Sequence, residues 1–196
     1  MTPSSPSRRR FLLSAAAIGA TAAAGFALLR MPSVFASGTI EGKPGKVAIH
    51  RFDEAGKSLG IATLDKVVKE PDEWQALLSS AAFYVARQEG TEAAFSGPHL
   101  DNHDAGLYRC TCCDNALFSS DTKYESGTGW PSFWQPIATE NVVELSDSSF
   151  DMVRTAISCA LCDAHLGHVF NDGPEPTGLR YCMNGIALRF APHPAA

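Results

Sequence analysis

Four of the six cysteines in this chain form two C-x-x-C pairs, and this pattern constrains the fold most. Cys110 and Cys113 make the first pair, and Cys159 and Cys162 make the second, with 45 residues between the pairs. Each C-x-x-C turn can direct two sulfurs toward one metal, so two such turns supply the four ligands of a tetrahedral zinc site. Four protein ligands close the coordination sphere, which indicates a structural ion. The pairs therefore predict one structural Zn²⁺ that joins two hairpins of a larger domain.

Three other interpretations of the pairs remain open. A single C-x-x-C also occurs in thioredoxin-like redox proteins, but that motif requires a βαβ context that this sequence does not suggest. Two disulfides would suit an oxidising compartment. A mixed site would use four candidate ligands that recur every three residues, namely Cys159, Cys162, His165 and His168. Such a site would leave Cys110 and Cys113 without a metal. Cys112, inside the first pair, is expected to be a partly buried bystander thiol.

Residues 1–36 have the pattern of a signal for export through the Tat route. Consecutive arginines in "SRRRFLL" precede an uncharged, Ala-rich run over 11–29, and small residues favour cleavage after Ala36. An uncleaved membrane anchor is the alternative, but a run dominated by Ala and Gly drives insertion only weakly. We therefore expect a periplasmic or otherwise exported protein that meets the membrane only during export.

The charge balance of the rest of the chain argues against nucleic acid as a partner. Four of the 16 basic residues and none of the 21 acidic residues lie in 1–36, so the remainder carries a net charge of −9. Negative charge repels nucleic acids and anionic membrane surfaces. We therefore expect no nucleic-acid partner.

Short apolar runs separated by turn residues predict a mainly β fold. "VAIHRF" alternates apolar and polar residues, and a second strand is expected at 61–68, so 37–70 is predicted to be an N-terminal extension with strands. "PDEWQALLS" predicts one short helix at the start of the main domain, 71–192, because Pro and two acidic residues lie in its first turn. The segment 83–97 is expected to be irregular after a helical start. The later runs are typical of antiparallel strands.

Cys182 is the cysteine that has no partner nearby in the sequence. The alternation in "GLRYCMNGIALRF" predicts one continuous strand that presents Arg180, Cys182 and Asn184 on the same face. His168 lies 14 residues earlier in another short strand, and antiparallel pairing would bring its imidazole to the thiol. Nearby positive charge favours the reactive thiolate. A buried structural cysteine beside core or zinc-site histidines is the alternative.

The stretch "SGTGWPSFW" is a second candidate for a functional site. Two glycines and a proline bracket Trp130, and an aromatic side chain on such a loop can form the wall of a pocket for a small apolar group. A cluster of core aromatics is the alternative interpretation of this stretch.

Four segments, taken together, resemble the methionine-R-sulfoxide reductase family, the B-type peptide methionine sulfoxide reductases. These are "GTEAAFSG", "YRCTCCDNALFSSDTKYESGTGWPSF", "CALCDAHLGHVFNDGPEPTGLRYCMNG" and "ALRF", and the match runs in order from about Trp74 to Phe190. The resemblance implies a β domain of two small antiparallel sheets, arranged like a tent. In the zinc-bearing members, the positions of the two cysteine pairs hold the ion.

The resemblance also implies the chemistry and the residues that perform it. The substrate would be the R epimer of oxidised methionine, mainly in peptides or exported proteins. The thiolate would attack the sulfoxide sulfur, a histidine would protonate the oxygen, and the cysteine would be left as a sulfenic acid. The matching residues are Cys182 as nucleophile, His168 as the best candidate for the acid, His165 and Asn184 as further polar site residues, and Trp130 against the substrate methyl group. Arg180 is expected at the substrate as well.

One position departs from a common family pattern. Many members carry a recycling cysteine before the tryptophan, as in "SGCGWPSF", and this chain has Thr128 there. We therefore expect a thioredoxin-like protein or another external thiol to reduce the sulfenic acid directly, with resolution by Cys112 as the alternative. A zinc-bearing module that binds methionine peptides without turnover is the non-enzymatic alternative.

Overall fold

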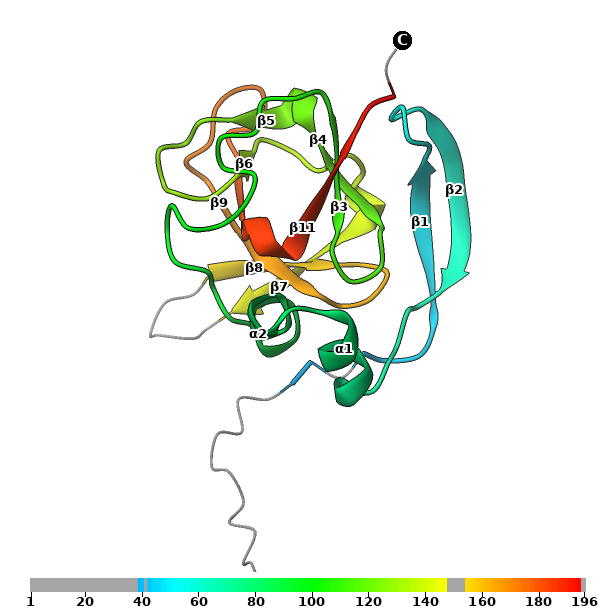
Figure 1. Ribbon diagram of the computed structural model, residues 1–196. Helices are drawn as coiled ribbons and strands as arrows, with labels where there is room; N and C mark the ends of the chain where they lie inside the picture. The colour runs from blue at the N-terminus through cyan, green and yellow to red at the C-terminus, as the bar shows by residue number, and fades with distance from the viewer. Residues whose placement is uncertain (1–38, 41, 148–153, 195–196) are drawn as a thin grey trace, which may run out of the picture. The chain divides into compact units, whose positions relative to one another are not determined.

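A computed structural model describes residues 39–40, 42–147 and 154–194. The predicted export signal, 1–36, lies outside the described residues, so it stays a prediction. Within the described part of the chain, no helix is both long enough and apolar enough to cross a membrane. The prediction of a mainly β fold is confirmed: in the described residues, the strands form three antiparallel sheets, accompanied by two α-helices (Figure 1).

The N-terminal extension forms a β-hairpin that lies along one side of the domain in Figure 1. β1 (Lys46–Phe52) and β2 (Ser58–Asp65) pair with each other as a separate two-stranded sheet. The buried side-chain amide of Asn141 attaches this hairpin to the main domain. Its Oδ1 accepts from the backbone N–H of His50 at 2.9 Å, and its Nδ2 donates to the carbonyl of His50 at 2.8 Å. A side chain thus makes the two bonds that a neighbouring strand would make.

Two helices connect the hairpin to the sheets. α1 (Pro71–Leu77) confirms the predicted helix and begins with a capping box between Glu70 and Glu73. α2 (Ser80–Gln88) begins earlier than the helical start expected at 83. The reason is a local cap, because the Ser79 hydroxyl accepts a backbone N–H of the first turn.

A buried arginine on α2 connects both helices to the second cysteine pair. The Arg87 side chain is 0% exposed and donates to the carbonyl of Cys162 at 2.8 Å and to that of Ile40 at 2.7 Å. Its guanidinium also lies 4.9 Å from the centre of the Trp74 ring. Hydrogen bonds and the aromatic face replace the water that the charge loses on burial.

The largest sheet has six strands and carries the lone cysteine near its middle. Their spatial order is β5 (Lys123–Tyr124), β6 (Ser132–Phe133), β10 (Arg180–Met183), β9 (His165–Phe170), β8 (Arg154–Cys159) and β7 (Val142–Asp147). The register places Cys182 between Ser132 on β6 and His168 on β9. The predicted antiparallel pairing of the Cys182 and His168 strands is confirmed.

A three-stranded sheet packs against the six-stranded one through aromatic rings. Its order is β11 (Leu188–Pro192), β3 (Gly106–Cys110) and β4 (Ala116–Ser119). The ring of Phe118 stacks on that of Phe133 with centroids 4.4 Å apart, and Tyr108 meets Phe133 edge-on at 5.0 Å. Burial of these rings stabilises the contact between the sheets. Short 3₁₀ turns complete the described fold at Ser120–Thr122, Thr139–Asn141 and Gly185–Ala187.

The prediction of one continuous strand through "GLRYCMNGIALRF" is wrong. β10 ends at Met183, a 3₁₀ turn follows at Gly185–Ala187, and the chain then enters the other sheet as β11. The Glu92 carboxylate accepts the backbone N–H groups of Gly185 and Ile186, which removes both from any strand pairing. Alternation therefore continues in the sequence where the strand does not.

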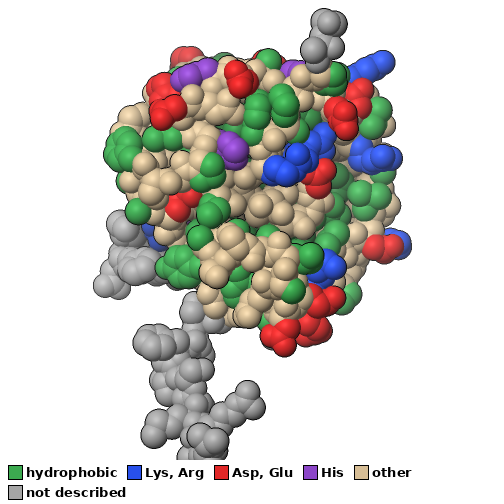
Figure 2. All heavy atoms as spheres, in the orientation of Figure 1, with side chains coloured by type: hydrophobic (Ala, Val, Ile, Leu, Met, Phe, Trp, Pro, Cys, Tyr) green, Lys and Arg blue, Asp and Glu red, His purple; other side chains and the backbone are tan. Residues whose placement is uncertain are grey.

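Charged side chains are distributed unevenly on the face shown in Figure 2. The Lys and Arg side chains lie mainly on the right, toward the β1–β2 hairpin, with acidic groups among them, whereas the upper left carries acidic groups and His.

Candidate functional site

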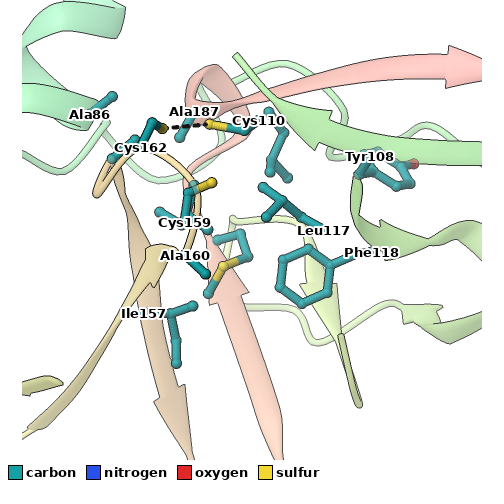
Figure 3. Close-up of a cluster of buried hydrophobic side chains, with 14 of the residues drawn as sticks. Ala86, Tyr108, Cys110, Leu117, Phe118, Ile157, Cys159, Ala160, Cys162 and Ala187 are labelled. Carbon is teal, nitrogen blue, oxygen red and sulfur yellow. Dashed lines mark hydrogen bonds between the residues drawn. The ribbon is translucent and has the colours of Figure 1, made fainter. Parts of the chain in front are cut away.

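The four cysteines of the two pairs form a single cluster, as predicted. Their sulfurs all lie within 4.8 Å of one another. The sulfurs of Cys110 and Cys162 are 3.7 Å apart (Figure 3), and those of Cys113 and Cys159 are 3.6 Å apart. Four sulfurs at ~2.3 Å from a tetrahedral zinc ion lie ~3.8 Å from each other. The spacing therefore fits a metal with four thiolate ligands.

The two turns that present these sulfurs have the same backbone geometry. Asp114 and Asp163, directly after the two pairs, both have left-handed backbone angles, with φ of 63° and 60°. Each aspartate donates its N–H to the carbonyl of the first cysteine of its pair, Cys110 or Cys159, at 2.9 Å. Aspartate tolerates the left-handed region better than most residues. Two equivalent turns thus each direct two sulfurs to one point.

The alternatives for the pairs do not match this geometry. All six cysteines are free, and a disulfide would need sulfurs ~2.05 Å apart. The cluster formed by the described residues contains the four cysteines and neither His165 nor His168, so the mixed site is not seen. The pairs lie at the ends of antiparallel hairpins, which is not the βαβ context of a thioredoxin-like motif.

The electrostatics of the cluster also favour a cation. Hydrogen bonds from neighbouring thiols, first that of Cys112, lower the pKa of Cys110 to about 6. The hydrogen bond that Cys113 makes to Cys110 raises the pKa of Cys113 in turn. One thiol ionises at the expense of its neighbours, because adjacent thiolates repel one another. A divalent cation would remove this conflict and allow all four to be thiolates.

Cys182 lies in a separate cavity of about 190 Å³. The cavity is lined by Thr91, Trp130, Arg154, Gly167, His168, Phe170, Cys182 and Asn184. The structure thus brings together four of the residues that the sequence proposed for the site. The other two, His165 and Arg180, do not line it. The cavity combines a nucleophilic sulfur, an imidazole and an amide with two aromatic walls.

A carboxylate fixes the imidazole of His168 beside the sulfur. Nε2 of His168 lies 2.8 Å from Oδ2 of Asp147, and the same oxygen lies 3.1 Å from a guanidinium nitrogen of Arg154. A carboxylate bonded to one ring nitrogen orients the ring. The imidazole of His168 is therefore held in one orientation where it borders the cavity of Cys182.

His165 lies behind His168 and is held neutral. Its side chain is 4% exposed and faces an adjoining cavity of about 640 Å³, which His168 also lines. Burial, reinforced by the charge of His168, lowers the pKa of His165 to about 4. Within the described residues, no protein group hydrogen-bonds its buried Nε2. At neutral pH it can offer polarity to the site, but it does not carry a proton to donate from a charged ring.

Arg180 supports the cavity from behind one of its walls. It makes a bidentate pair with Asp172, at 2.9 Å and 2.8 Å, and its guanidinium lies 4.3 Å from the centre of the Phe170 ring. The bond to Asp172, together with the charge of Cys182, raises the pKa of Arg180. The bond to Arg180 lowers the pKa of Asp172 in return. Arg180 thus orients Phe170, and its positive charge reaches Cys182 while being shared with Asp172.

Asn184 and Trp130 are held by the same loop residue. Oδ1 of Asn184 accepts from the backbone N–H of Glu92 at 3.0 Å, and its Nδ2 donates to the carbonyl of Leu166 at 3.1 Å. Among the described residues, the second N–H of this amide has no hydrogen-bond partner, and Asn184 borders the cavity. The indole Nε1 of Trp130 donates to the carbonyl of Glu92 at 3.2 Å. The indole edge is thereby anchored, and the ring borders the cavity.

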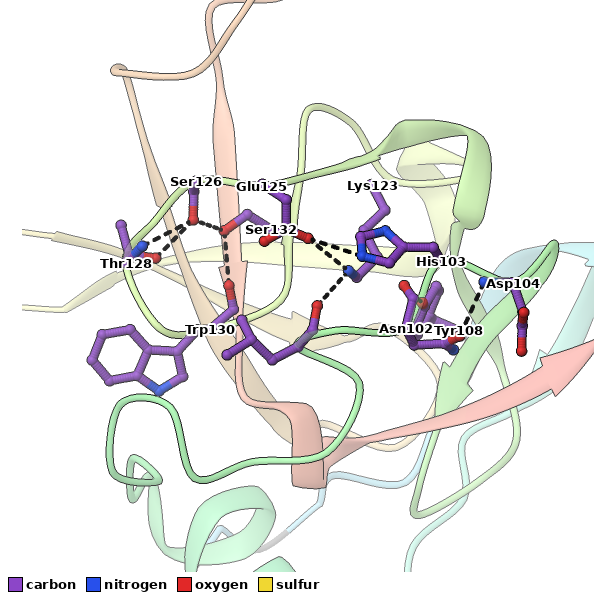
Figure 4. A network of polar contacts seen from close by, with 11 residues as sticks. Asn102, His103, Asp104, Tyr108, Lys123, Glu125, Ser126, Thr128, Trp130 and Ser132 are labelled. Atoms are coloured by element: carbon purple, nitrogen blue, oxygen red, sulfur yellow. Dashed lines mark hydrogen bonds and ion pairs between the residues drawn. The ribbon is translucent and has the colours of Figure 1, made fainter.

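A chain of hydroxyl groups reaches the Cys182 sulfur through Thr128. Oγ1 of Thr128 lies 3.7 Å from Sγ of Cys182 and 2.8 Å from the hydroxyl of Ser126, which lies 2.7 Å from that of Ser132 (Figure 4). Position 128 is therefore in contact with the sulfur but offers no thiol. Cys112 instead lies against the cysteine cluster, where its hydrogen bond to Cys110 raises its pKa, although the bond to Cys162 opposes the rise.

Several residues of the site were not identified from the sequence. Asp147 has no local signal, because its role arises from strand pairing across 21 residues. Arg154 and Phe170 border the cavity for the same reason. Thr91 and Glu92 lie in "GTEAAFSG", which matched the family motifs, so their position in that segment was the available signal.

Comparison with known proteins places these features in one family. The model of the SelR domain matches residues 78–192. The chain is 52% identical over 126 residues to the peptide methionine sulfoxide reductase MsrB of Herminiimonas arsenicoxydans, covering 64% of this chain and 92% of the relative. It is 53% identical to the MsrB protein of Hahella chejuensis over 65% of this chain and 91% of the relative. It is 50% identical to the MsrB protein of Pseudomonas putida over 133 residues, which cover 68% of this chain and 100% of the relative.

Proposed function

This chain belongs to the SelR-domain family of peptide methionine sulfoxide reductases, and on that premise we propose that it reduces the R epimer of peptide-bound methionine sulfoxide with Cys182 as nucleophile. The observation that carries the proposal is the cavity in which the Cys182 sulfur, the carboxylate-bound imidazole of His168 and the indole of Trp130 meet. These groups are a nucleophile, a proton source and an apolar wall, which together suit a small polar group with a methyl substituent.

The proposed reaction transfers one oxygen and two electrons. The Cys182 thiolate attacks the sulfoxide sulfur, and the sulfur–oxygen bond of the substrate breaks. His168 delivers a proton to the oxygen, which bonds to the Cys182 sulfur as the bond between the two sulfurs breaks, so that Cys182 is left as a sulfenic acid. The substrate leaves as the thioether methionine, reduced by two electrons, and the cysteine is oxidised by two. The free N–H of Asn184 is placed to orient the oxygen during this transfer.

Selection of one epimer follows from the two fixed sides of the cavity. The sulfoxide sulfur bears an oxygen, a methyl group and the substrate chain. If Trp130 holds the methyl group and His168 receives the oxygen, the chain can leave the cavity in one direction for one epimer only. The opposite epimer would have to place its oxygen against the indole or its methyl group against the imidazole.

Peptide-bound substrate is favoured by the hollows next to the Cys182 cavity. A cavity of about 640 Å³ shares Thr91, Arg154 and His168 with it, and another of about 310 Å³ shares Arg154 and Phe170. Space therefore extends from the reaction cavity in two directions. A peptide could continue on both sides of the oxidised residue, whereas free methionine sulfoxide would leave these hollows to water.

We further propose that the protein is exported by the Tat route, acts in the periplasm and repairs oxidised exported proteins. The signal pattern in 1–36 supports the route. An external thiol or a thioredoxin-like protein would reduce the sulfenic acid, because position 128 provides a hydroxyl. One Zn²⁺ on the four clustered cysteines would hold the two hairpins together, and its closed sphere gives it a structural role.

The test is turnover of separated R and S sulfoxides of a blocked methionine peptide with a dithiol reductant. Wild type should reduce the R epimer, and Cys182→Ser should lose activity by a factor on the order of 10³ or more while keeping its zinc. Cys112→Ser is the matched control and should keep activity. Equal turnover of both epimers, or activity in Cys182→Ser, would refute the proposal. Binding without turnover in wild type would favour a binding module.

A further inference from the structure

Glu92 is bonded to three parts of the site, although its side chain does not line the cavity. Its carboxylate accepts the backbone N–H of Gly185 at 2.5 Å and that of Ile186 at 3.0 Å. These groups start the 3₁₀ turn that follows β10, and such N–H groups have no partner within the turn. The carboxylate thereby fixes the chain directly after the Cys182 strand.

The backbone of Glu92 makes the other two connections. Its N–H donates to Oδ1 of Asn184 at 3.0 Å, and its carbonyl accepts from the indole Nε1 of Trp130 at 3.2 Å. Figure 4 shows the Trp130 indole lying against the loop that follows α2, where Glu92 is found. One residue therefore holds two walls of the cavity, the apolar wall and the amide, at a fixed separation.

The surroundings of the carboxylate indicate a built position. Glu92 is half-buried, and this burial raises its pKa, although the two backbone N–H groups oppose the rise. The space for the carboxylate depends on Gly97, because a Cβ at that position would overlap it. Burial of a carboxylate costs free energy, so a carboxylate in this place needs the bonds it makes there.

We propose that Glu92 is a positioning residue that sets the epimer selectivity of the cavity by fixing Trp130 and Asn184 relative to Cys182. The inference rests on the proposed function. The carboxylate anchors the loop to the 3₁₀ turn, and the anchored backbone then carries both bonds to the cavity walls. Without the anchor, the loop backbone that carries both bonds can shift relative to Cys182, and the opposite epimer is excluded less strictly.

Two variants test this from different directions. Glu92→Gln keeps the size of the side chain but places an NH₂ donor against one of the two backbone N–H groups, so one hydrogen bond is lost. Gly97→Ala keeps the carboxylate and displaces it with a methyl group, without a requirement for a left-handed backbone at 97. Glu140→Gln, at an exposed carboxylate in another part of the fold, is the matched control.

The measurements are kcat and KM for the separated R and S sulfoxides of a blocked methionine peptide, zinc content, and the NMR signal of the Trp130 indole N–H. We expect Glu92→Gln and Gly97→Ala to lower kcat/KM for the R epimer about tenfold, to lower the R-to-S ratio and to shift the indole signal, with zinc retained. Glu140→Gln should match wild type. If Glu92→Gln does not fold, the same measurements on Gly97→Ala test the inference alone.

Two results would overturn the inference, and they are distinguishable. If wild type prefers the R epimer and both variants keep its ratio within twofold, Glu92 has no positioning role. If wild type itself shows no R preference, the proposed function fails, and the inference fails with it.

Discussion

The protein has two kinds of cysteine environment, and their difference shows how neighbours decide what a thiol does. In the cluster, each sulfur lies beside other sulfurs, at 3.6 and 3.7 Å for the pairs that bridge the two turns. Cys182 instead has a threonine hydroxyl at 3.7 Å and shares its cavity with an imidazole and an indole. The first arrangement suits a cation, and the second suits a substrate.

One strand, β9, connects the two cysteine environments and keeps them apart. β9 starts at His165, three residues after the last cysteine of the cluster, and pairs with the Cys182 strand at His168. The turn that holds Cys159 and Cys162 thus fixes the start of the strand that carries His168, the proposed proton source. A structural ion at one end would position the reactive end without taking part in the reaction.

Loss of the cluster should have the largest effect. Cys159→Ala removes one ligand and leaves three thiols without a closed metal sphere. We expect loss of zinc and a drop in the free energy of unfolding of at least several kcal/mol, or failure to fold, because metal binding contributes directly to folding. Urea unfolding and zinc analysis measure both, with Cys112→Ser as the control that keeps the ion. A stable, active Cys159→Ala protein would show that the cluster holds no structural metal.

Loss of the proton source should have the next largest effect, confined to activity. His168→Gln is expected to lower kcat for the R sulfoxide by about 10² to 10⁴, the usual contribution of a general acid. Zinc content and the unfolding midpoint should stay near wild type. His103→Gln, at an exposed histidine, is the matched control. A decrease in kcat of less than threefold would mean that another group delivers the proton.

The buried neutral His165 predicts a pH dependence of stability. Its pKa is lowered from 6.5 to about 4, chiefly by burial, so the folded state resists protonation more than the unfolded state does. Stability is therefore highest above pH 6.5 and falls as the pH drops from 6.5 to about 4, by about 3 kcal/mol in total. Unfolding free energies of wild type and His165→Gln between pH 7.5 and 4.5 should show a shallower loss in the variant. Parallel curves would contradict this.

The smallest effect is expected at the residue that touches the Cys182 sulfur. Thr128→Cys should place a thiol within reach, so that one turnover ends in a disulfide between position 128 and Cys182 and in the loss of two free thiols. The rate of the first turnover should change less than about threefold, because the nucleophile and the acid are untouched. Thr128→Ser is the control and should lose one free thiol. A sulfenic acid that persists in Thr128→Cys would show that the contact does not allow bonding.

The difference between the two cysteine environments also explains which parts of the structure could be predicted from the sequence. The cluster was predictable because C-x-x-C spacing fixes where sulfurs point within one turn. The meeting of Cys182 and His168 was predictable because the short, turn-rich connection between their segments favours antiparallel pairing. Both predictions depend on local geometry or on one strand pairing.

The features that were missed depend on residues far apart in the sequence. Alternation continues through Asn184, but the strand stops there because Glu92, about 90 residues earlier, takes the N–H groups of the following turn. Asp147 orients His168 only after β7, β8 and β9 have paired. The bond to Asp172 likewise places Arg180 behind the cavity wall. Such contacts exist only once the sheet is assembled.

The most direct test of the two-environment account is to map all six cysteines after one equivalent of R-sulfoxide peptide without reductant. The account predicts one methionine released per chain, a sulfenic acid trapped by dimedone at Cys182, unmodified cluster cysteines and full retention of zinc. A disulfide between Cys112 and Cys182, or oxidation of a cluster cysteine with release of zinc, would contradict it.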